Sequence, residues 1–115
     1  MKQVVLKTLD PGGAEGWHDW LKNHHLGSPG VWLIFYRQGS GKKSISYDEA
    51  VDAALAYGWI DSMIKKLDDR RYARKFTPRR TGSVWSKTNV ERVQALTHEG
   101  RMTRWGLEAF EGRQE

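Results

Sequence analysis

Apolar segments separated by polar turns predict four strands along the chain. Segments rich in β-branched and aromatic residues lie at Val4–Leu9, Val31–Tyr36, Trp59–Leu67 and Arg71–Thr77. The second segment is apolar throughout, which is typical of a central strand that is buried on both faces. The last two flank the turn residues 68–70, so we expect them to form an antiparallel hairpin.

Apolar side chains at helical spacing predict a first helix over residues 14–25. Trp17, Trp20, Leu21 and His24 lie at positions i, i+3, i+4 and i+7, which places them on one face of a helix. We therefore expect these four side chains to lie in the core.

Polar caps predict the starts of three further helices. Ser46 and Glu49 have the spacing of a capping box, and Gly58 is well placed to end the helix that they begin. Ser86 and Thr103 are the corresponding caps of the last two helices. The side chains expected to face the core are Ala50, Val51, Ala54 and Leu55, then Val90, Val93 and Leu96, and finally Leu107 and Phe110.

The resulting order of elements, β-α-β-α-β-β-α-α, predicts an α+β fold. We expect a sheet of three to four strands with an antiparallel hairpin, covered by helices. The 115 residues form a single predicted domain over residues 1–115, because two halves would each be too small to bury an adequate core.

Composition indicates the cellular compartment and excludes membrane spans and cysteine-based sites. The chain has no cysteine, and its longest apolar run, Val31–Tyr36, is much shorter than a membrane span. The N-terminus returns to Lys7 after three apolar residues, so it lacks the apolar block of a secretory signal. We therefore expect a soluble, cytoplasmic protein with no membrane insertion.

Positive charge is concentrated in one part of the chain. The net charge is +5, and residues 65–87 hold nine basic residues against two acidic ones. Tyr72, Phe76 and Trp85 are interleaved with these charges. Such a segment attracts anionic partners, although a solvated basic surface would have the same composition.

Motifs for phosphate loops, metal sites and serine hydrolases do not fit. The glycines and lysines of residues 37–44 lack the phosphate-loop spacing, and no Gly-x-Ser-x-Gly elbow is present. His18, His24 and His25 have no carboxylate at a matching spacing, so exposed or helix-capping histidines are the simpler interpretation. We expect no metal, no cofactor and no identifiable catalytic residue.

The strongest candidate site combines a pair of arginines with a helix start. Arg79 and Arg80 precede the Ser86 cap by a few residues, and guanidinium groups and a helix N-terminus both favour an anion. Alternatively, Asp61 pairs with Arg79 or Arg80 as a structural link, and the tryptophans belong to the core. The candidate ligand-binding residues are Trp59, Asp61, Ser62, Tyr72, Arg79, Arg80, Ser83, Trp85, Ser86, Lys87 and Asn89.

The same residues carry a family resemblance. The blocks Gly58–Ser62, Thr77–Arg80, Ser83–Asn89 and Gly100–Thr103, with further blocks upstream, resemble the YdeI/OmpD-associated family, also called bacteriocin-protection proteins. The resemblance implies a bacterial role in tolerance of antimicrobial peptides and an association with an outer-membrane porin. It implies no catalytic residue. Longer members continue into a basic helical segment, so we expect a chain that ends at Glu115 to lack any partner binding located there.

Three functional hypotheses follow. In the first, which we favour, the chain is a binding module for an anionic small molecule or an acidic protein group. In the second, Tyr72, Phe76 and Trp85 stack on nucleic-acid bases while basic residues contact phosphates. In the third, the chain is an enzyme with Asp61 as acid or base. The sequence predicts no oligomeric state.

Overall fold

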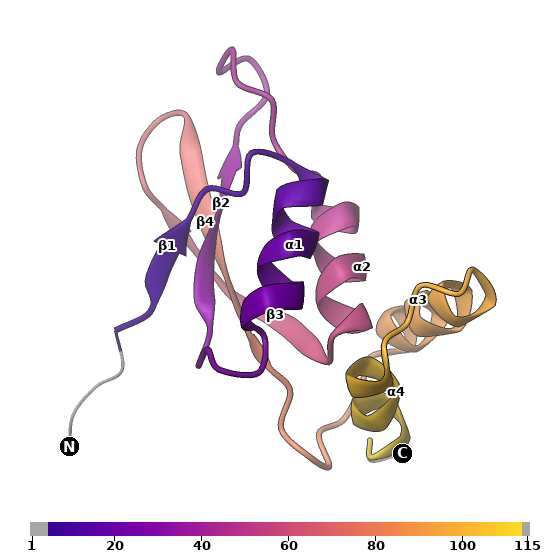
Figure 1. Cartoon of the computed structure of the whole chain (residues 1–115). Coiled ribbons are helices and arrows are strands. Elements are labelled where there is room, and N and C mark those ends of the chain that lie inside the picture. The colour runs from indigo at the N-terminus through magenta and orange to yellow at the C-terminus, as the bar shows by residue number, and fades with distance from the viewer. Residues whose placement is uncertain (1–4, 114–115) are drawn as a thin grey trace.

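The computed structural model describes residues 5–113 and confirms the predicted α+β fold in the predicted order. The elements are β1 (Lys7–Leu9), α1 (Ala14–His24), β2 (Val31–Tyr36), α2 (Tyr47–Ala56), β3 (Trp59–Lys66), β4 (Arg71–Pro78), α3 (Lys87–His98) and α4 (Arg104–Glu111) (Figure 1). Within the described residues, β1 is shorter than predicted, and the predicted start of this strand at Val4 lies outside them.

The four strands form one mixed sheet in the order β1-β2-β4-β3. β2 pairs with β1 in parallel and with β4 in antiparallel orientation, so it is central as predicted. β3 and β4 form the predicted hairpin, with a register irregularity between Asp61 and Ile64. The hairpin therefore occupies one side of the sheet, with β3 at the edge.

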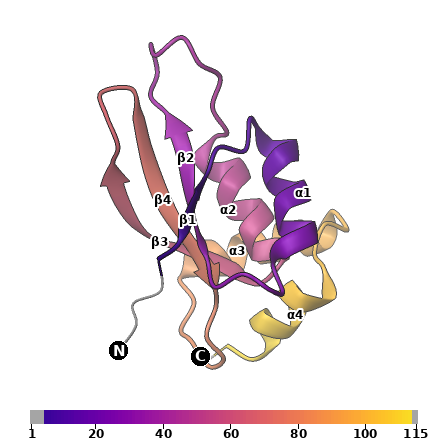
Figure 2. The same cartoon turned by 60° about the vertical axis from the view of Figure 1, so that its left-hand side comes forward.

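Helices α1 and α2 cover one face of the sheet, and within residues 5–113 no helix covers the other face (Figures 1 and 2). The prediction that β2 is buried on both faces was therefore wrong in part. Val31, Leu33 and Phe35 are buried on the helix side. On the opposite side Ile34 is buried as well, whereas Trp32 and Tyr36 are only half-buried. On that open face, the Lys65 ammonium lies 4.1 Å from the centroid of the Trp32 ring. The side of β2 that was expected to be fully buried thus meets a lysine at Trp32.

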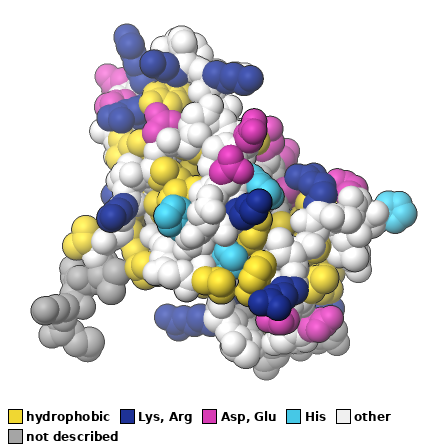
Figure 3. Space-filling view, viewed as in Figure 1, with side chains coloured by type: hydrophobic (Ala, Val, Ile, Leu, Met, Phe, Trp, Pro, Cys, Tyr) yellow, Lys and Arg dark blue, Asp and Glu magenta, His cyan; other side chains and the backbone are white. Residues whose placement is uncertain are grey.

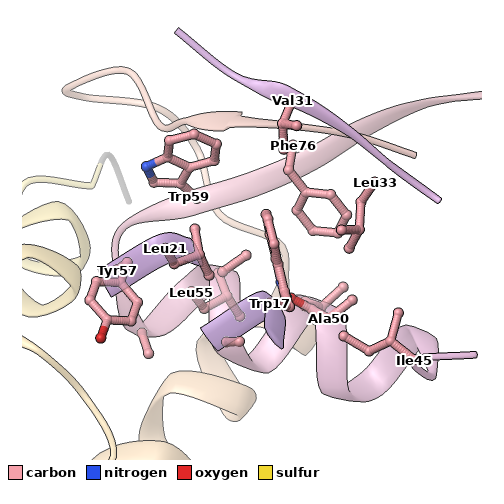
Figure 4. Close-up of a cluster of buried hydrophobic side chains, with 14 of the residues drawn as sticks. Trp17, Leu21, Val31, Leu33, Ile45, Ala50, Leu55, Tyr57, Trp59 and Phe76 are labelled. Atoms are coloured by element: carbon pink, nitrogen blue, oxygen red, sulfur yellow. The ribbon is translucent and has the colours of Figure 1, made fainter. Parts of the chain in front are cut away.

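Trp17 is central to the core between α1, α2 and the sheet (Figure 4). Its ring stacks on Trp20 with a centroid distance of 5.6 Å and meets the edge of Phe76 at 5.2 Å. Its indole N–H donates a hydrogen bond of 3.0 Å to the carbonyl of Ala50. This contact satisfies a buried donor and also fixes α1 against α2.

The predicted inner face of α1 was wrong at His24. This side chain is exposed and lies against Trp20, with 5.2 Å between the ring centroids. His25 is buried instead, because it lies four residues after the buried Leu21 and therefore one helical turn along the same stripe.

The predicted capping box at the start of α2 is confirmed. Ser46 Oγ accepts the Glu49 backbone N–H at 3.1 Å, and Glu49 Oε1 accepts the Ser46 backbone N–H at 3.0 Å. These hydrogen bonds stabilise the carboxylate and lower the pKa of Glu49. The contribution of Glu49 to stability is therefore present at neutral pH and is lost as the pH falls through the lowered folded-state pKa.

Removing the cap should destabilise the fold. We expect Ser46→Ala to lower the free energy of unfolding by about 1 kcal/mol at pH 7, because the first turn of α2 loses its side-chain acceptor. Urea denaturation measures this change. Ser62→Ala, on the exposed part of β3, is the control and should alter stability by less than about 0.5 kcal/mol. Equal effects of the two substitutions would contradict the assignment.

Helices α3 and α4 both pack against α2 (Figure 1). The Arg92 guanidinium bridges Asp48 at 2.6 Å and Asp52 at 3.0 Å, which joins α3 to α2. Ser86 and Thr103 cap the two helices as predicted.

The predicted core side chains of these two helices are only partly buried. Val93 and Leu96 are buried, whereas Val90 is half-buried. In α4, Phe110 packs against the core, and Leu107 is half-buried without joining the core cluster. Within residues 5–113, every helix is too short or too polar to cross a lipid bilayer.

Candidate functional site

Asp61 does not pair with Arg79 or Arg80, so that part of the predicted alternative was wrong, whereas Trp59 and Trp85 do lie in the core. Its carboxylate lies 3.7 Å from the Arg74 guanidinium. Asp61 is opposite Phe76 in the sheet, and Arg74 is two residues from Phe76 on the same face, so the two side chains are diagonal neighbours. Arg74 also lies over the Tyr47 ring at 4.4 Å. Burial and the nearby Asp61 carboxylate raise the pKa of Tyr47.

The other polar and aromatic residues of the predicted site lie in several places. Tyr72 stacks on Phe35 with 5.3 Å between the ring centroids. Ser62 is exposed on β3, and Lys87 is exposed at the start of α3. The Ser86 hydroxyl is occupied by the backbone N–H of Asn89, at 3.1 Å. None of these five side chains lines the cleft described below.

The basic segment of residues 65–87 does not form one continuous patch. Alternation along β3 and β4 sends Arg74 toward the helices and Lys65 toward the open face. Arg71 pairs with Asp68 at 2.9 Å, and Lys66 pairs with an aspartate of the same turn. On the face seen in Figure 3, basic, acidic and histidine side chains are mixed.

Arg79 and Arg80 instead line a cleft of about 380 Å³ at the α4 end of the molecule, which we call the His25–Arg79 cleft. Its walls come from the end of α1, the turn between α2 and β3, the loop after β4, and α4. The side chains used in the argument below are His25, Tyr57, Arg79, Arg80, Trp105 and Glu108. Trp59 also lines the cleft, although its ring is buried in the core.

Arg79 is held by Trp85 and has donors without partners. Its guanidinium carbon lies 3.9 Å from the centroid of the Trp85 ring, and Nη2 donates to the Val84 carbonyl at 3.2 Å. Nε and Nη1 are buried and have no hydrogen-bond partner among the described residues. Burial lowers the pKa of Arg79, because desolvation disfavours the charged form.

Trp85 supports this arginine, and neither Trp85 nor Ser83 lines the cleft. Trp85 is 7% exposed and packs edge-on against Phe110, with 5.3 Å between the ring centroids. Its indole N–H and the Ser83 hydroxyl are also buried without partners in the described part of the chain. Trp85 therefore acts as a platform beneath Arg79.

His25 is the second polar group of the cleft, and the sequence interpretation missed it. It is 7% exposed, and its Nδ1 lies 2.8 Å from the Leu21 carbonyl oxygen. A carbonyl only accepts, so Nδ1 carries a hydrogen, and Nε2 of the neutral ring is an acceptor. Nε2 is buried and has no partner within residues 5–113. The spacing of Trp17, Leu21 and His25, at i, i+4 and i+8, was the signal that places this ring on the buried stripe.

Aromatic rings fix the orientation of His25. Its ring centroid lies 4.9 Å from that of Tyr57 and 4.6 Å from that of Trp105. The Nδ1 edge is bonded to α1, so the unpartnered Nε2 lies on the opposite edge of a ring that lines the cleft.

Gly58 allows the walls of the cleft to approach one another. Its φ of +77° reverses the chain between α2 and β3, and a Cβ there would lie 3.1 Å from the Trp105 carbonyl oxygen. The Arg79 backbone N–H donates to the Gly58 carbonyl at 2.9 Å. This hydrogen bond places the arginine beside the turn, so a side chain at residue 58 would disturb both α4 and Arg79.

The cleft combines opposite hydrogen-bonding capacities. Arg79 and Arg80 provide positive charge and donors, His25 provides an acceptor, and the exposed Glu108 adds one negative charge. Among residues 5–113, the cleft included, no three His, Cys, Asp or Glu side chains come close enough together to hold a metal ion. The arrangement fits a small polar group that accepts from the arginines.

Comparison with known proteins identifies one family. A family model described as a domain of unknown function, DUF8412, matches residues 10–109, a range that includes His25, Arg79 and Glu108. No curated protein and no solved structure matches the chain.

Proposed function

The chain belongs to the DUF8412 family, and we propose that it is a binding protein whose His25–Arg79 cleft holds a small anionic group. The observation that carries this proposal is the state of Arg79. A cationic guanidinium is desolvated beside a cleft, two of its nitrogens have no acceptor, and no acidic side chain among the described residues pairs with it.

The energetics favour an anionic ligand. A buried donor without a partner costs about 1–3 kcal/mol, and hydrogen bonds to charged groups are worth about 1.5–3 kcal/mol. An oxyanion in the cleft supplies acceptors and opposite charge to Arg79 together. Because the ring of Trp85 supports the guanidinium from below, its orientation is set before the ligand arrives.

Inorganic phosphate is the first probe for this proposal. We expect phosphate to raise the melting temperature of the wild-type protein, with about 2.7 kcal/mol of stabilisation at a concentration one hundred times the Kd. Arg79→Gln should weaken binding about 10- to 100-fold, the equivalent of one lost charge-assisted contact. Arg79→Lys tests whether charge alone suffices, because lysine lacks the planar fork. Isothermal titration calorimetry measures each Kd.

Arg37→Gln is the matched control. Arg37 also lies over an aromatic ring, that of Tyr72 at 5.1 Å, but does not line the cleft. The substitution removes the same charge, so a general effect of net charge should appear in both variants. Equal weakening by Arg79→Gln and Arg37→Gln would overturn the proposal.

The two alternative functions find less support. Base stacking needs exposed rings, yet Phe76 and Trp85 are buried and Tyr72 is stacked on Phe35. A role for Asp61 as acid or base needs an open site, but its carboxylate faces Arg74 and lies outside the cleft. The role in bacteriocin tolerance and the cytoplasmic location stay predictions, as does the resemblance to the YdeI/OmpD-associated family.

A further inference from the structure

The His25–Arg79 cleft offers a hydrogen-bond acceptor as well as cationic donors. Because Nδ1 of His25 donates to the Leu21 carbonyl, Nε2 of the neutral ring presents a lone pair. This nitrogen is buried and has no partner among the described residues. Within residues 5–113 the cleft therefore lacks both an acceptor for Arg79 and a donor for His25. An anion with acceptors alone satisfies the arginine and leaves the histidine unpaired.

We infer that the cleft selects an oxyanion that carries a proton, namely a phosphate group with one P–OH, over an oxyanion that only accepts. This inference rests on the proposed anion-binding function and names its ligand class. The P–OH donates to His25 Nε2, while the remaining oxygens accept from Arg79 and Arg80. The second pKa of a phosphate monoester is about 6, so the protonated form is abundant near that pH.

Sulfate is the matched probe because it has the same tetrahedral shape and carries no proton near neutral pH. Sulfate therefore supplies acceptors to Arg79 and Arg80 but no hydrogen to Nε2 of the neutral His25 ring. The charged residues that line the cleft together with His25 are Arg79, Arg80 and Glu108, and the rings in contact with it, Tyr57 and Trp105, are uncharged. Sulfate should therefore bind more weakly than phosphate.

Free phosphate and phosphate esters offer the same hydrogen-bonding groups, so an experiment must decide which of the two is the ligand. The cleft volume of about 380 Å³ exceeds that of a phosphate group, and Tyr57 and Trp105 add apolar wall beside the polar groups. Phenyl phosphate therefore serves as the ester probe. Tighter binding of phenyl phosphate than of phosphate identifies an esterified ligand, whereas the reverse order identifies the free anion.

The decisive experiment is calorimetric titration of the whole chain with phosphate, phenyl phosphate and sulfate near pH 7, where an unperturbed imidazole is mostly neutral and phosphate still carries its second proton in part. We expect wild-type protein to bind the better phosphate probe at least about tenfold more tightly than sulfate, the loss expected from one unpaired polar group. Phosphate binding should weaken as the pH rises above the second pKa of the ligand. In His25→Phe, which keeps a ring between Tyr57 and Trp105, the preference over sulfate should disappear.

Two further variants keep the test interpretable. His25→Asn retains a short side-chain donor for the Leu21 carbonyl but has no acceptor at the Nε2 position, so it should also lose the preference. His24→Asn changes the neighbouring exposed histidine, which lies outside this cleft, and should leave the preference intact. Far-UV circular dichroism and thermal melting establish that each variant is folded.

The outcomes separate the two proposals. If phosphate and sulfate bind equally and both depend on Arg79, the anion site stands and the inference about the protonated ligand is overturned. If folded His25 variants keep the wild-type preference, the inference is overturned as well. If none of the three probes binds the wild-type protein, the proposed function and the inference fail together.

Discussion

Gly106→Ala is expected to displace α4 from α2 and to weaken the binding of phosphate. Gly106 is buried, and a Cβ at this position would meet the Ala56 carbonyl oxygen and lie 2.7 Å from the Leu55 carbonyl oxygen. These are backbone atoms, so no side-chain rotation relieves the overlap. Overpacking of this kind costs about 1–3 kcal/mol.

The effect of Gly106→Ala extends to the cleft because α4 forms one of its walls. The Thr103 backbone N–H also donates to the Ala56 carbonyl, at 3.1 Å, so displacement of the helix breaks a hydrogen bond at its start. Trp105 and Glu108 would move with the helix away from His25. We therefore expect a lower melting temperature and a phosphate Kd raised at least about tenfold, if ligand binding needs the closed cleft.

Gly112→Ala is the control for the stability part of this prediction; because Gly112 also lines the cleft, it is not a control for phosphate binding. Gly112 follows α4 and has a negative φ, and a Cβ there would approach no atom closer than 3.4 Å. Alanine should thus be tolerated at residue 112, with a change in stability within about 0.5 kcal/mol. If alanine at residue 106 is tolerated equally well, close packing of α4 on α2 does not hold the cleft together.

Trp17→Ala is expected to have the largest effect on stability, a loss of about 3–5 kcal/mol. The side chain is fully buried and contacts Trp20, Phe76 and the Ala50 carbonyl. The total stability of a domain of this size is about 5–15 kcal/mol, so the variant should be close to unfolded at 37 °C. Chemical denaturation followed by circular dichroism measures the loss.

Two further tryptophan variants separate cavity formation from the hydrogen bond. Trp17→Phe keeps an aromatic ring but removes the donor to Ala50. We therefore expect a smaller loss of stability, about 1–3 kcal/mol, from the unpaired Ala50 carbonyl and the reduced side-chain volume. Trp32→Ala removes the same side chain from the open face, where the ring is half-buried. A loss at Trp32 as large as that at Trp17 would contradict the placement of the core on the helix side.

Features that depend on neighbouring residues were predictable from the sequence. The Ser46 capping box and the Ser86 and Thr103 caps involve hydrogen bonds between residues three apart. The β3–β4 hairpin joins strands separated by only a short turn. Such local interactions are encoded in the order of residues, so the order of elements followed as well.

Features that depend on strand register, or on what covers each face of the sheet, could not be predicted from the sequence. The sequence interpretation offered Arg79 or Arg80 as partners of Asp61, whereas register in the hairpin places Arg74 diagonal to it. The apolar sequence of β2 indicated burial on both faces, yet on the open face Trp32 is half-buried and the Lys65 ammonium lies over its ring. Hydrophobic pattern alone does not distinguish a covering helix from a long charged side chain that lies along an apolar ring.

By itself, the sequence determined the α+β class, the order of the elements, the helix caps and the prominence of the arginine pair after β4. Only the tertiary structure decided that Arg79 shares a cleft with His25 and α4 rather than with Asp61, Tyr72 and the start of α3. The physical reason is that His25 and Trp105 are distant in the chain and meet only because α4 packs backbone to backbone on the end of α2 at Gly106. That contact depends on three-dimensional packing, which local patterns do not specify.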